Sequence, residues 1–268
     1  MAGLEDEAET VRKSQVCSGT LASVPPQSDQ LAPSRKHFRV TIRCAVAETR
    51  ADTPTGRVTV ERRSVDWIVC VAGLGVLLIC ALIVHKGMAS SLEQHVFRWI
   101  NGWPDFLSSP MKLAPFLGVL AVGPIVAVGA AVFRRWRLAL AAIIVTVGKL
   151  ASERIVWRYV QRSRPGTTIS GAIVRGDTPT SGLAFVSGHV VLVTGLAWVL
   201  TPHLRGGWRI LPWAVVGLVS FARIYLGAHA PLDVIGGVGL GLIVGGTANL
   251  IEGVERKGAG SYEGVKVS

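Results

Sequence analysis

The sequence predicts an all-α membrane protein with six transmembrane helices. Its 268 residues are 50% hydrophobic and only 17% charged, a composition typical of polytopic membrane proteins. Most of the net charge of +11 flanks the apolar runs, which is where the positive-inside rule and anionic lipid headgroups place Lys and Arg. Because no basic helix or nucleic-acid motif accompanies this charge, we do not expect the chain to bind nucleic acid.

The apolar runs divide the chain into three parts. Residues 1–63 are polar, rich in Ser, Thr and Pro, and carry mixed charge, so we expect a disordered N-terminal extension. Residues 64–252 hold all six runs and are predicted to form the membrane domain. Residues 253–268 are Gly-rich and charged, and we expect a flexible tail.

The first half of the membrane domain predicts two spans and one interfacial helix. Residues 65–84 form an apolar run of about 20 residues, which is long enough to cross a bilayer. Residues 90–101 mix apolar and polar side chains, which indicates a short amphipathic helix in the outer interface. A second span over 113–133 is followed by the basic turn 134–137, which the positive-inside rule places in the cytoplasm.

The second half predicts four more spans and a second basic turn. Lys149, Glu153 and Arg154 lie in the outer half of the third span, and we expect them to face the bundle interior or the interface because charges in lipid are costly. The turn 201–209 is basic and predicted to be cytoplasmic. The four spans are predicted at 138–156, 185–200, 210–226 and 232–251.

One basic segment breaks the positive-inside pattern. With six spans and both termini inside, residues 158–164 lie on the outer side although they contain Arg158, Arg162 and Arg164. An anionic ligand at that end of the bundle would explain this position.

Two further polar stretches fall at the same end. Ser187, Gly188 and His189 open the fourth span, where backbone N–H groups and the helix dipole favour an anion. Arg223 ends the fifth span, and arginines such as this one and Arg164 can donate two hydrogen bonds to a phosphate. The three stretches together predict a phosphate site.

The histidines in these stretches suggest nucleophilic catalysis. Asp233 follows His229 by four residues, so on a helix its carboxylate would lie against the imidazole and fix its tautomer. His189 would then protonate a leaving oxygen while His229 attacks phosphorus.

These motifs resemble those of the type 2 phosphatidic acid phosphatase (PAP2) superfamily, which contains integral-membrane lipid phosphatases related to vanadium haloperoxidases. The second and third family motifs read Ser187-Gly188-His189 and Arg223-x5-His229-x3-Asp233 here. The resemblance covers about residues 65–251 and implies a haloperoxidase-like helical bundle.

The resemblance also implies a role for each residue of these motifs. His229 would be the nucleophile that forms a phosphohistidine, with Asp233 orienting it. His189 would be the acid that later activates water. No metal or other cofactor is implied. The implied phosphate-binding residues are Arg164, Ser187, Gly188 and Arg223.

The first family motif, Lys-x6-Arg-Pro, is incomplete in this chain. Trp157 stands at the position of the lysine, and we expect the neighbouring Arg158 to supply the missing phosphate-binding cation. Val186 and Ala222 replace the family's Pro and Ser, and neither position supplies a charge.

The expected function is hydrolysis of a lipid phosphate or polyprenyl (pyro)phosphate at the extracytoplasmic face of the cell membrane. Two alternatives stay open. The same scaffold could pass the phosphoryl group to an acceptor other than water. Alternatively, a catalytically weak member of the family could serve as a lipid-binding protein.

Overall fold

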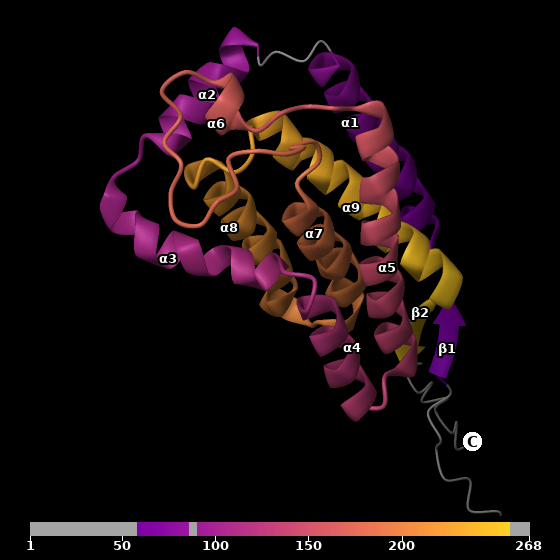
Figure 1. The fold of residues 1–268 in the computed structure, drawn as a ribbon. Helices are drawn as coiled ribbons and strands as arrows, with labels where there is room; N and C mark the ends of the chain where they lie inside the picture. The colour runs from indigo at the N-terminus through magenta and orange to yellow at the C-terminus, as the bar shows by residue number, and fades with distance from the viewer. Residues whose placement is uncertain (1–57, 86–89, 258–268) are drawn as a thin grey trace, which may run out of the picture. The chain divides into compact units, whose positions relative to one another are not determined.

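The computed structural model describes residues 58–85 and 90–257, so most of the predicted N-terminal extension and the end of the tail lie outside the described residues. The chain folds as a helical bundle with one two-stranded antiparallel sheet (Figure 1). The elements in chain order are β1 (Val58–Glu61), α1 (Ser64–Val84), α2 (Ser91–Asn101), η1 (Asp105–Leu107), α3 (Ser108–Leu113), η2 (Ala114–Gly118), α4 (Val122–Val132), α5 (Trp136–Tyr159), α6 (Pro165–Thr168), α7 (Gly188–Leu200), η3 (Thr201–His203), η4 (Gly206–Ile210), α8 (Leu211–Tyr225), α9 (Pro231–Glu252) and β2 (Val254–Lys257).

Helix α7 lies at the centre of the bundle, with α5, α8 and α9 packed around it (Figure 1). Its residues are apolar on all sides and most of them are buried, as expected of a helix that other helices surround. Small residues allow this packing. A Cβ on Gly241 of α9 would lie 2.7 Å from the carbonyl oxygen of Val191, so only glycine permits this approach.

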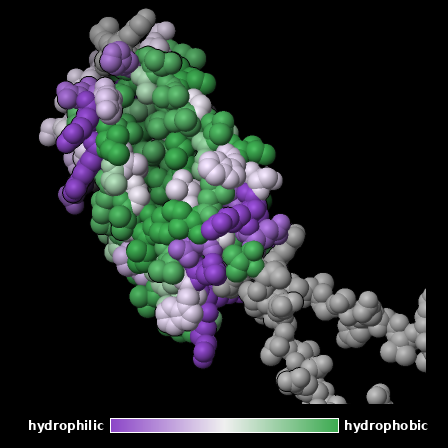
Figure 2. Space-filling model, turned by 90° about the vertical axis from the view of Figure 1, so that its right-hand side faces the viewer, coloured by the Kyte–Doolittle hydropathy of each residue, from purple (hydrophilic) through white to green (hydrophobic). Residues whose placement is uncertain are grey.

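The outer surface of the bundle is apolar where a bilayer would contact it. Figure 2 shows a broad hydrophobic area between hydrophilic residues at either end. On α1, for example, Val71 and Leu82 are exposed. Within residues 58–85 and 90–257, three helical segments are long and apolar enough to cross a membrane, namely Ser64–Val84, Gly206–Tyr225 and Pro231–Glu252. The chain is therefore an all-α membrane protein, while the count of six spans stays a prediction.

The predicted second span is not one helix. Residues 105–118 and 122–132 form two helical pieces bent by 62° at a short break, and together they could make one broken span. Pro115 lies in the first turn of η2, and a proline both lacks a donor and restricts the residue before it. The break brings Gly118 against His189, since a Cβ at 118 would lie 2.9 Å from the Cβ of that histidine.

Two other predicted spans also differ from the structure. Helix α7 has 13 residues and begins at Gly188, because residues 185–187 are buried in a non-helical segment that leads into the site. Helix α5 has 24 residues and carries Lys149 and Glu153 as an ion pair of 2.6 Å.

Strand β2 gives regular structure to residues 254–257, where the sequence predicted a flexible tail, and it pairs with β1.

Candidate active site

Three segments that are distant in the sequence meet at one end of the bundle. The backbone N–H of Ala184 donates to the carbonyl oxygen of Arg162 at 2.7 Å, and that of Ser187 donates to the carbonyl oxygen of Asp233 at 3.0 Å. Arg164 Nη1 donates to the carbonyl oxygen of Ala228 at 3.0 Å. These contacts join the segment after α5, the start of α7 and the α8–α9 loop into one site.

His229 is held by a backbone carbonyl group. Its Nδ1 donates to the carbonyl oxygen of Ala184 at 2.9 Å, whereas the nearest Asp233 oxygen lies 3.9 Å from Nδ1, beyond hydrogen-bond range. A carbonyl oxygen can only accept, so Nδ1 carries the proton and Nε2 keeps its lone pair. The expected orienting role of Asp233 is thus filled by the main chain at Ala184.

The electrostatic surroundings of His229 keep it neutral. The ring is almost completely buried, and burial together with the positive charges of Arg223 and Arg164 holds the pKa of His229 well below its usual value. A neutral imidazole with a free Nε2 is the form that can act as a nucleophile.

Asp233 instead belongs to a buried charge network. Arg162 donates to Glu93 at 2.9 and 2.6 Å through its two terminal nitrogens, and Nη1 also donates to Asp233 at 2.9 Å. The second Asp233 oxygen accepts from the backbone N–H of Ala230 at 2.8 Å. Asp233 is 0% exposed and Glu93 is 5% exposed. The network fixes the start of α9 and, four residues earlier in the chain, His229.

Sequence reasoning did not assign a role to Glu93. The predicted amphipathic helix is present as α2, but its buried side chains are Glu93, Phe97 and Asn101, while Leu92 is 73% exposed. These buried residues follow one another at four-residue spacing, and this spacing is the signal that could have identified Glu93. On the same face of α2, the side-chain amide of Asn101 donates a hydrogen bond to the carbonyl oxygen of Tyr225 at 2.8 Å.

Two donor groups near His229 have no partner in the part of the chain that the structure describes. The Ser187 hydroxyl is buried without a hydrogen bond, and it does not cap helix α7. The Nε of Arg223 is likewise buried and unpaired, with 8% of that residue exposed. Unsatisfied buried donors are costly, and an anion bound between them and the α7 N-terminus would satisfy them.

Lys149 lies at this same point of the site. A Cβ on Gly188 would lie 2.9 Å from the Nζ of Lys149, and Glu153 holds that ammonium group at 2.6 Å. We expected Lys149 to face the bundle interior or the interface and did not assign it to the site, because it lies eight residues before the family's lysine position. The position of Lys149 makes it a second candidate for the missing cation.

The structure does not bring Arg158 to these residues. Arg158 is exposed on α5, and within residues 58–85 and 90–257 no hydrogen bond or ion pair joins it to the site. Trp157, at the family's lysine position, buries its indole N–H without a partner among the described residues. The choice between Lys149 and Arg158 is therefore a matter for mutagenesis.

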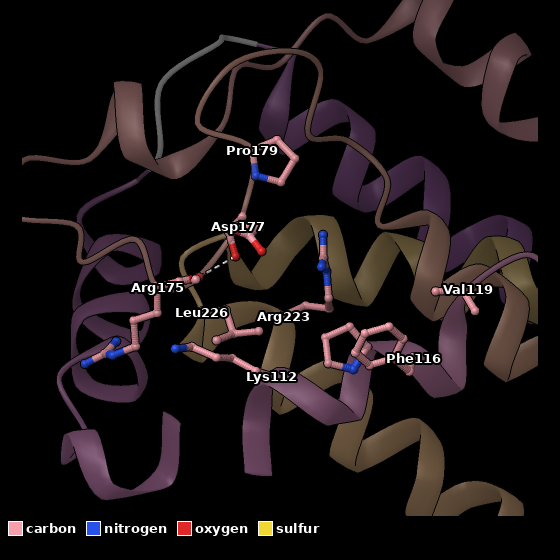
Figure 3. A pocket seen from close by; sticks show the side chains of 11 residues that line it. Lys112, Phe116, Val119, Arg175, Asp177, Pro179, Arg223 and Leu226 are labelled. Atoms are coloured by element: carbon pink, nitrogen blue, oxygen red, sulfur yellow. Dashed lines mark hydrogen bonds between the residues drawn. The ribbon is translucent and has the colours of Figure 1, made fainter. Parts of the chain in front are cut away.

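His189 and a cavity complete the site. The imidazole of His189 is half-buried and borders Gly118 of η2. A cavity of about 410 Å³ extends from Arg223 to η2, the end of α3 and the 175–179 loop (Figure 3). Across the described residues, no group of three or more His, Cys, Asp or Glu is arranged to hold a metal ion. The arrangement suits transfer of a phosphoryl group to His229.

Comparison with known proteins agrees with this geometry. The sequence model of the PAP2 superfamily matches residues 134–255, which include α5, α7, the α8–α9 loop and the donors described above. This region of the chain is therefore similar to the PAP2 superfamily.

Individual proteins with similar sequences are phosphatases. The chain is similar to a lipid A 4'-phosphatase from Porphyromonas gingivalis, with 42% identity over 23% of this chain and 26% of that protein. It is also similar to a decaprenylphosphoryl-5-phosphoribose phosphatase from Mycobacterium tuberculosis, with 35% identity over 37% of this chain and 52% of that protein. The chain thus spans about a quarter and about half of the lengths of these relatives.

The fold is shared with a solved membrane phosphatase. The crystal structure of a transmembrane PAP2-type phosphatidylglycerolphosphate phosphatase from Bacillus subtilis superposes with a TM-score of 0.55 at 23% identity, covering 67% of this chain and 94% of that chain. The prediction of a PAP2-like helical bundle is confirmed.

Proposed function

We propose that the protein is a membrane phosphatase that hydrolyses a lipid phosphate or a polyprenyl (pyro)phosphate through a phosphohistidine on His229. The observation that carries the proposal is the hydrogen bond from His229 Nδ1 to the Ala184 carbonyl oxygen, which leaves a neutral Nε2 as the attacking atom. The PAP2 match and the phosphatase relatives support the same class of reaction.

The first half of the reaction transfers the phosphoryl group to the enzyme. The Nε2 lone pair of His229 attacks phosphorus while the bond from phosphorus to the leaving oxygen breaks. The negative charge of the bound phosphate favours protonation of His189, which as imidazolium gives its proton to that oxygen. Arg164, Arg223 and the N-terminus of α7 stabilise the charge on the three equatorial phosphoryl oxygens.

The second half returns the enzyme to its starting state. His189 is now neutral and takes a proton from a water molecule whose oxygen attacks phosphorus. The phosphorus–nitrogen bond breaks, inorganic phosphate leaves, and Nε2 of His229 recovers its lone pair. Substrate, water and protons balance over the two steps.

The distribution of basic residues supports an extracytoplasmic site. The basic turn before α5 and the basic segment between α7 and α8 lie at the end of the bundle opposite to the site. The positive-inside rule assigns basic connections to the cytoplasm, so the site would face the extracytoplasmic side. There, a phosphate headgroup can enter the site while its chain stays in the bilayer.

The test is phosphate release by the purified protein in detergent from phosphatidic acid, a polyprenyl phosphate and a polyprenyl diphosphate. His229→Gln should abolish release and the labelling of protein by ³²P-substrate. The label on wild-type protein should be acid-labile and alkali-stable, as expected for a phosphorus–nitrogen bond. His95→Gln is the matched control, because His95 is an exposed histidine of α2. An equally active His229→Gln variant would refute the mechanism.

A further inference from the structure

An apolar groove runs along the central helix of the bundle, and the phosphoryl transfer described above uses none of its residues. Its volume is about 310 Å³, and every residue that lines it is apolar. Helix α7 forms its floor, because Val193 and Ala197 line it and are almost completely buried. Segment η2 and the start of α8 form its rims, where Leu117 and Leu211 are exposed. The groove is therefore open between apolar rims that a bilayer would contact.

The bend in the predicted second span shapes this groove. Residues 105–118 and 122–132 meet at 62°, so η2 and α4 border the groove from two directions. Leu117 lines it before the bend, and Val122 and Val126 line it after the bend. Helix α4 packs against α5, and α8 packs against α7, with the groove between the two pairs. Such a space offers no hydrogen-bond partner to water, so an apolar ligand is the occupant that suits it.

The groove begins beside His189, the proposed acid. The α7 residues in its lining follow His189 by four, seven, eight and eleven positions, namely Val193, Leu196, Ala197 and Leu200. This spacing places them on the same face of the helix as His189. A second contact agrees, since Gly118 lies against His189 and the preceding residue, Leu117, lines the groove. An oxygen atom that His189 protonates would thus lie at the upper end of the groove.

The length of this face matches the depth of one bilayer leaflet. From His189 to Leu200, α7 rises about 16 Å at ~1.5 Å per residue. The hydrocarbon core of a bilayer is about 30 Å thick, and one leaflet is half as deep. With the site on the extracytoplasmic side, the groove would run from the outer interface towards the middle of the bilayer. A lipid chain of the outer leaflet points in the same direction.

We propose that the groove binds the hydrocarbon chain attached to the leaving oxygen, and that its walls determine which chain lengths are hydrolysed efficiently. This inference rests on the proposed function and adds a chain-binding site to it. The chain gains little hydrophobic free energy on leaving lipid, because lipid and groove are both apolar. The benefit is one of position. A chain fixed along α7 holds the leaving oxygen beside His189 and phosphorus in line with Nε2 of His229.

The first test measures kcat/KM in one detergent for butyl phosphate and for dodecyl phosphate. Val126→Phe and Val215→Phe narrow the groove from α4 and from α8. Each should lower the ratio of kcat/KM for dodecyl phosphate to that for butyl phosphate by about tenfold, because a misplaced methylene group in an apolar pocket has effects of this size. Val71→Phe is the matched control, since Val71 is exposed on α1, and it should leave the ratio unchanged. The esters partition into detergent equally with every variant, so a change of ratio reports on the protein.

The second test locates the chain directly. Dodecylphosphonate has a phosphorus–carbon bond that hydrolysis of an ester does not cleave, and a diazirine near the end of its chain attaches it to neighbouring residues on illumination. The label should fall within residues 193–200 or 211–215, and excess dodecylphosphonate without the diazirine should displace it. Label in the groove that is not displaced would identify ordinary lipid or detergent as the occupant and overturn the inference. Displaceable label on α1 or α5 alone would overturn it too.

The outcomes separate the inference from the proposed function. Two variants on opposite walls, together with the label, keep the test decisive where one variant does not fold. Hydrolysis of both esters with an unchanged ratio in both groove variants overturns the inference alone. If neither ester is hydrolysed by the wild-type protein, the proposed function fails and the inference with it.

Discussion

Lys149 should be the cation that completes the phosphate site. Its Nζ lies 2.9 Å from where a Cβ on Gly188 would be, and a carboxylate oxygen of Glu153 lies nearer still, so a phosphoryl group bound at the Gly188 N–H would be close to both side chains. At a separation of about 4 Å a unit charge pair contributes about 4 kcal/mol at an effective dielectric constant of ~20. Glu153, at 2.6 Å, offsets part of this attraction.

The expected loss is therefore about 3 kcal/mol of transition-state stabilisation, which corresponds to roughly a hundredfold fall in turnover. Lys149→Met removes the charge and keeps most of the side-chain volume. Turnover is measured as phosphate release in detergent, at equal amounts of folded protein judged by size-exclusion chromatography. Arg158→Ala is measured beside it, because sequence analysis assigned the missing cation to Arg158.

A double variant separates two causes of the loss. In Lys149→Met alone, Glu153 loses its partner and its negative charge could repel the substrate. Lys149→Met with Glu153→Gln removes that repulsion. If the double variant regains wild-type turnover, or if Arg158→Ala is the variant that loses a hundredfold, the reasoning from Gly188 is refuted.

Four further outcomes are expected. Activity should persist in excess EDTA, because a histidine nucleophile and cationic side chains need no Lewis acid; loss that a divalent ion restores would contradict the mechanism. The acid limb of the pH profile of kcat/KM should lie well below pH 6.5, because the lowered pKa of His229 keeps its imidazole neutral at that pH. Arg164→Ala should move this limb to higher pH, because the substitution removes a positive charge that lowers the pKa of His229. Glu93→Gln should lower the free energy of unfolding in detergent by about 3 kcal/mol, with His95→Gln as its control. In a cysteine-free background, an impermeant thiol reagent on intact cells should label Thr167→Cys and spare Arg135→Cys, and the reverse pattern would invert the topology.

The parts of the fold that the sequence predicted well are those with continuous physical signals. Helix α1 runs over Ser64–Val84, within a residue of the predicted run, because a long uncharged apolar stretch has one stable solution in a bilayer. Helix α9 begins at Pro231, and a proline is favoured in the first turn of a helix. Charged residues and prolines in the local sequence indicate where such helices begin and end.

The broken second span was not predictable from hydropathy. Its two pieces are as apolar as a single span, so their composition hides the bend of 62°. The break also has a tertiary side that hydropathy does not contain, since it lies next to the close contact of Gly118 with His189. Hydropathy reports the transfer of residues to lipid and carries no information about contacts with another helix.

The site residues that could be proposed from the sequence are those that belong to short motifs. His189, Arg223 and His229 are such residues, and the structure places them at one end of the bundle, where Arg223 also lines the cavity. Lys149 and Glu93 were not assigned because their partners are distant in the sequence. Glu93 accepts hydrogen bonds from Arg162 and from the backbone N–H of Leu232, which lie 69 and 139 residues beyond it. No local sequence pattern indicates such partners.

The Ala184 carbonyl group has a consequence for how this site tolerates mutation. The group that sets the tautomer of His229 belongs to the main chain, so no exchange of the Ala184 side chain deletes it. An alanine scan would therefore test the side chains of the proposed site and still miss the carbonyl oxygen that orients His229, the proposed nucleophile. The position of the Ala184 carbonyl group depends on the hydrogen bond from the backbone N–H of Ala184 to the carbonyl oxygen of Arg162. Lesions that shift this segment would therefore inactivate the protein while leaving every motif residue in place.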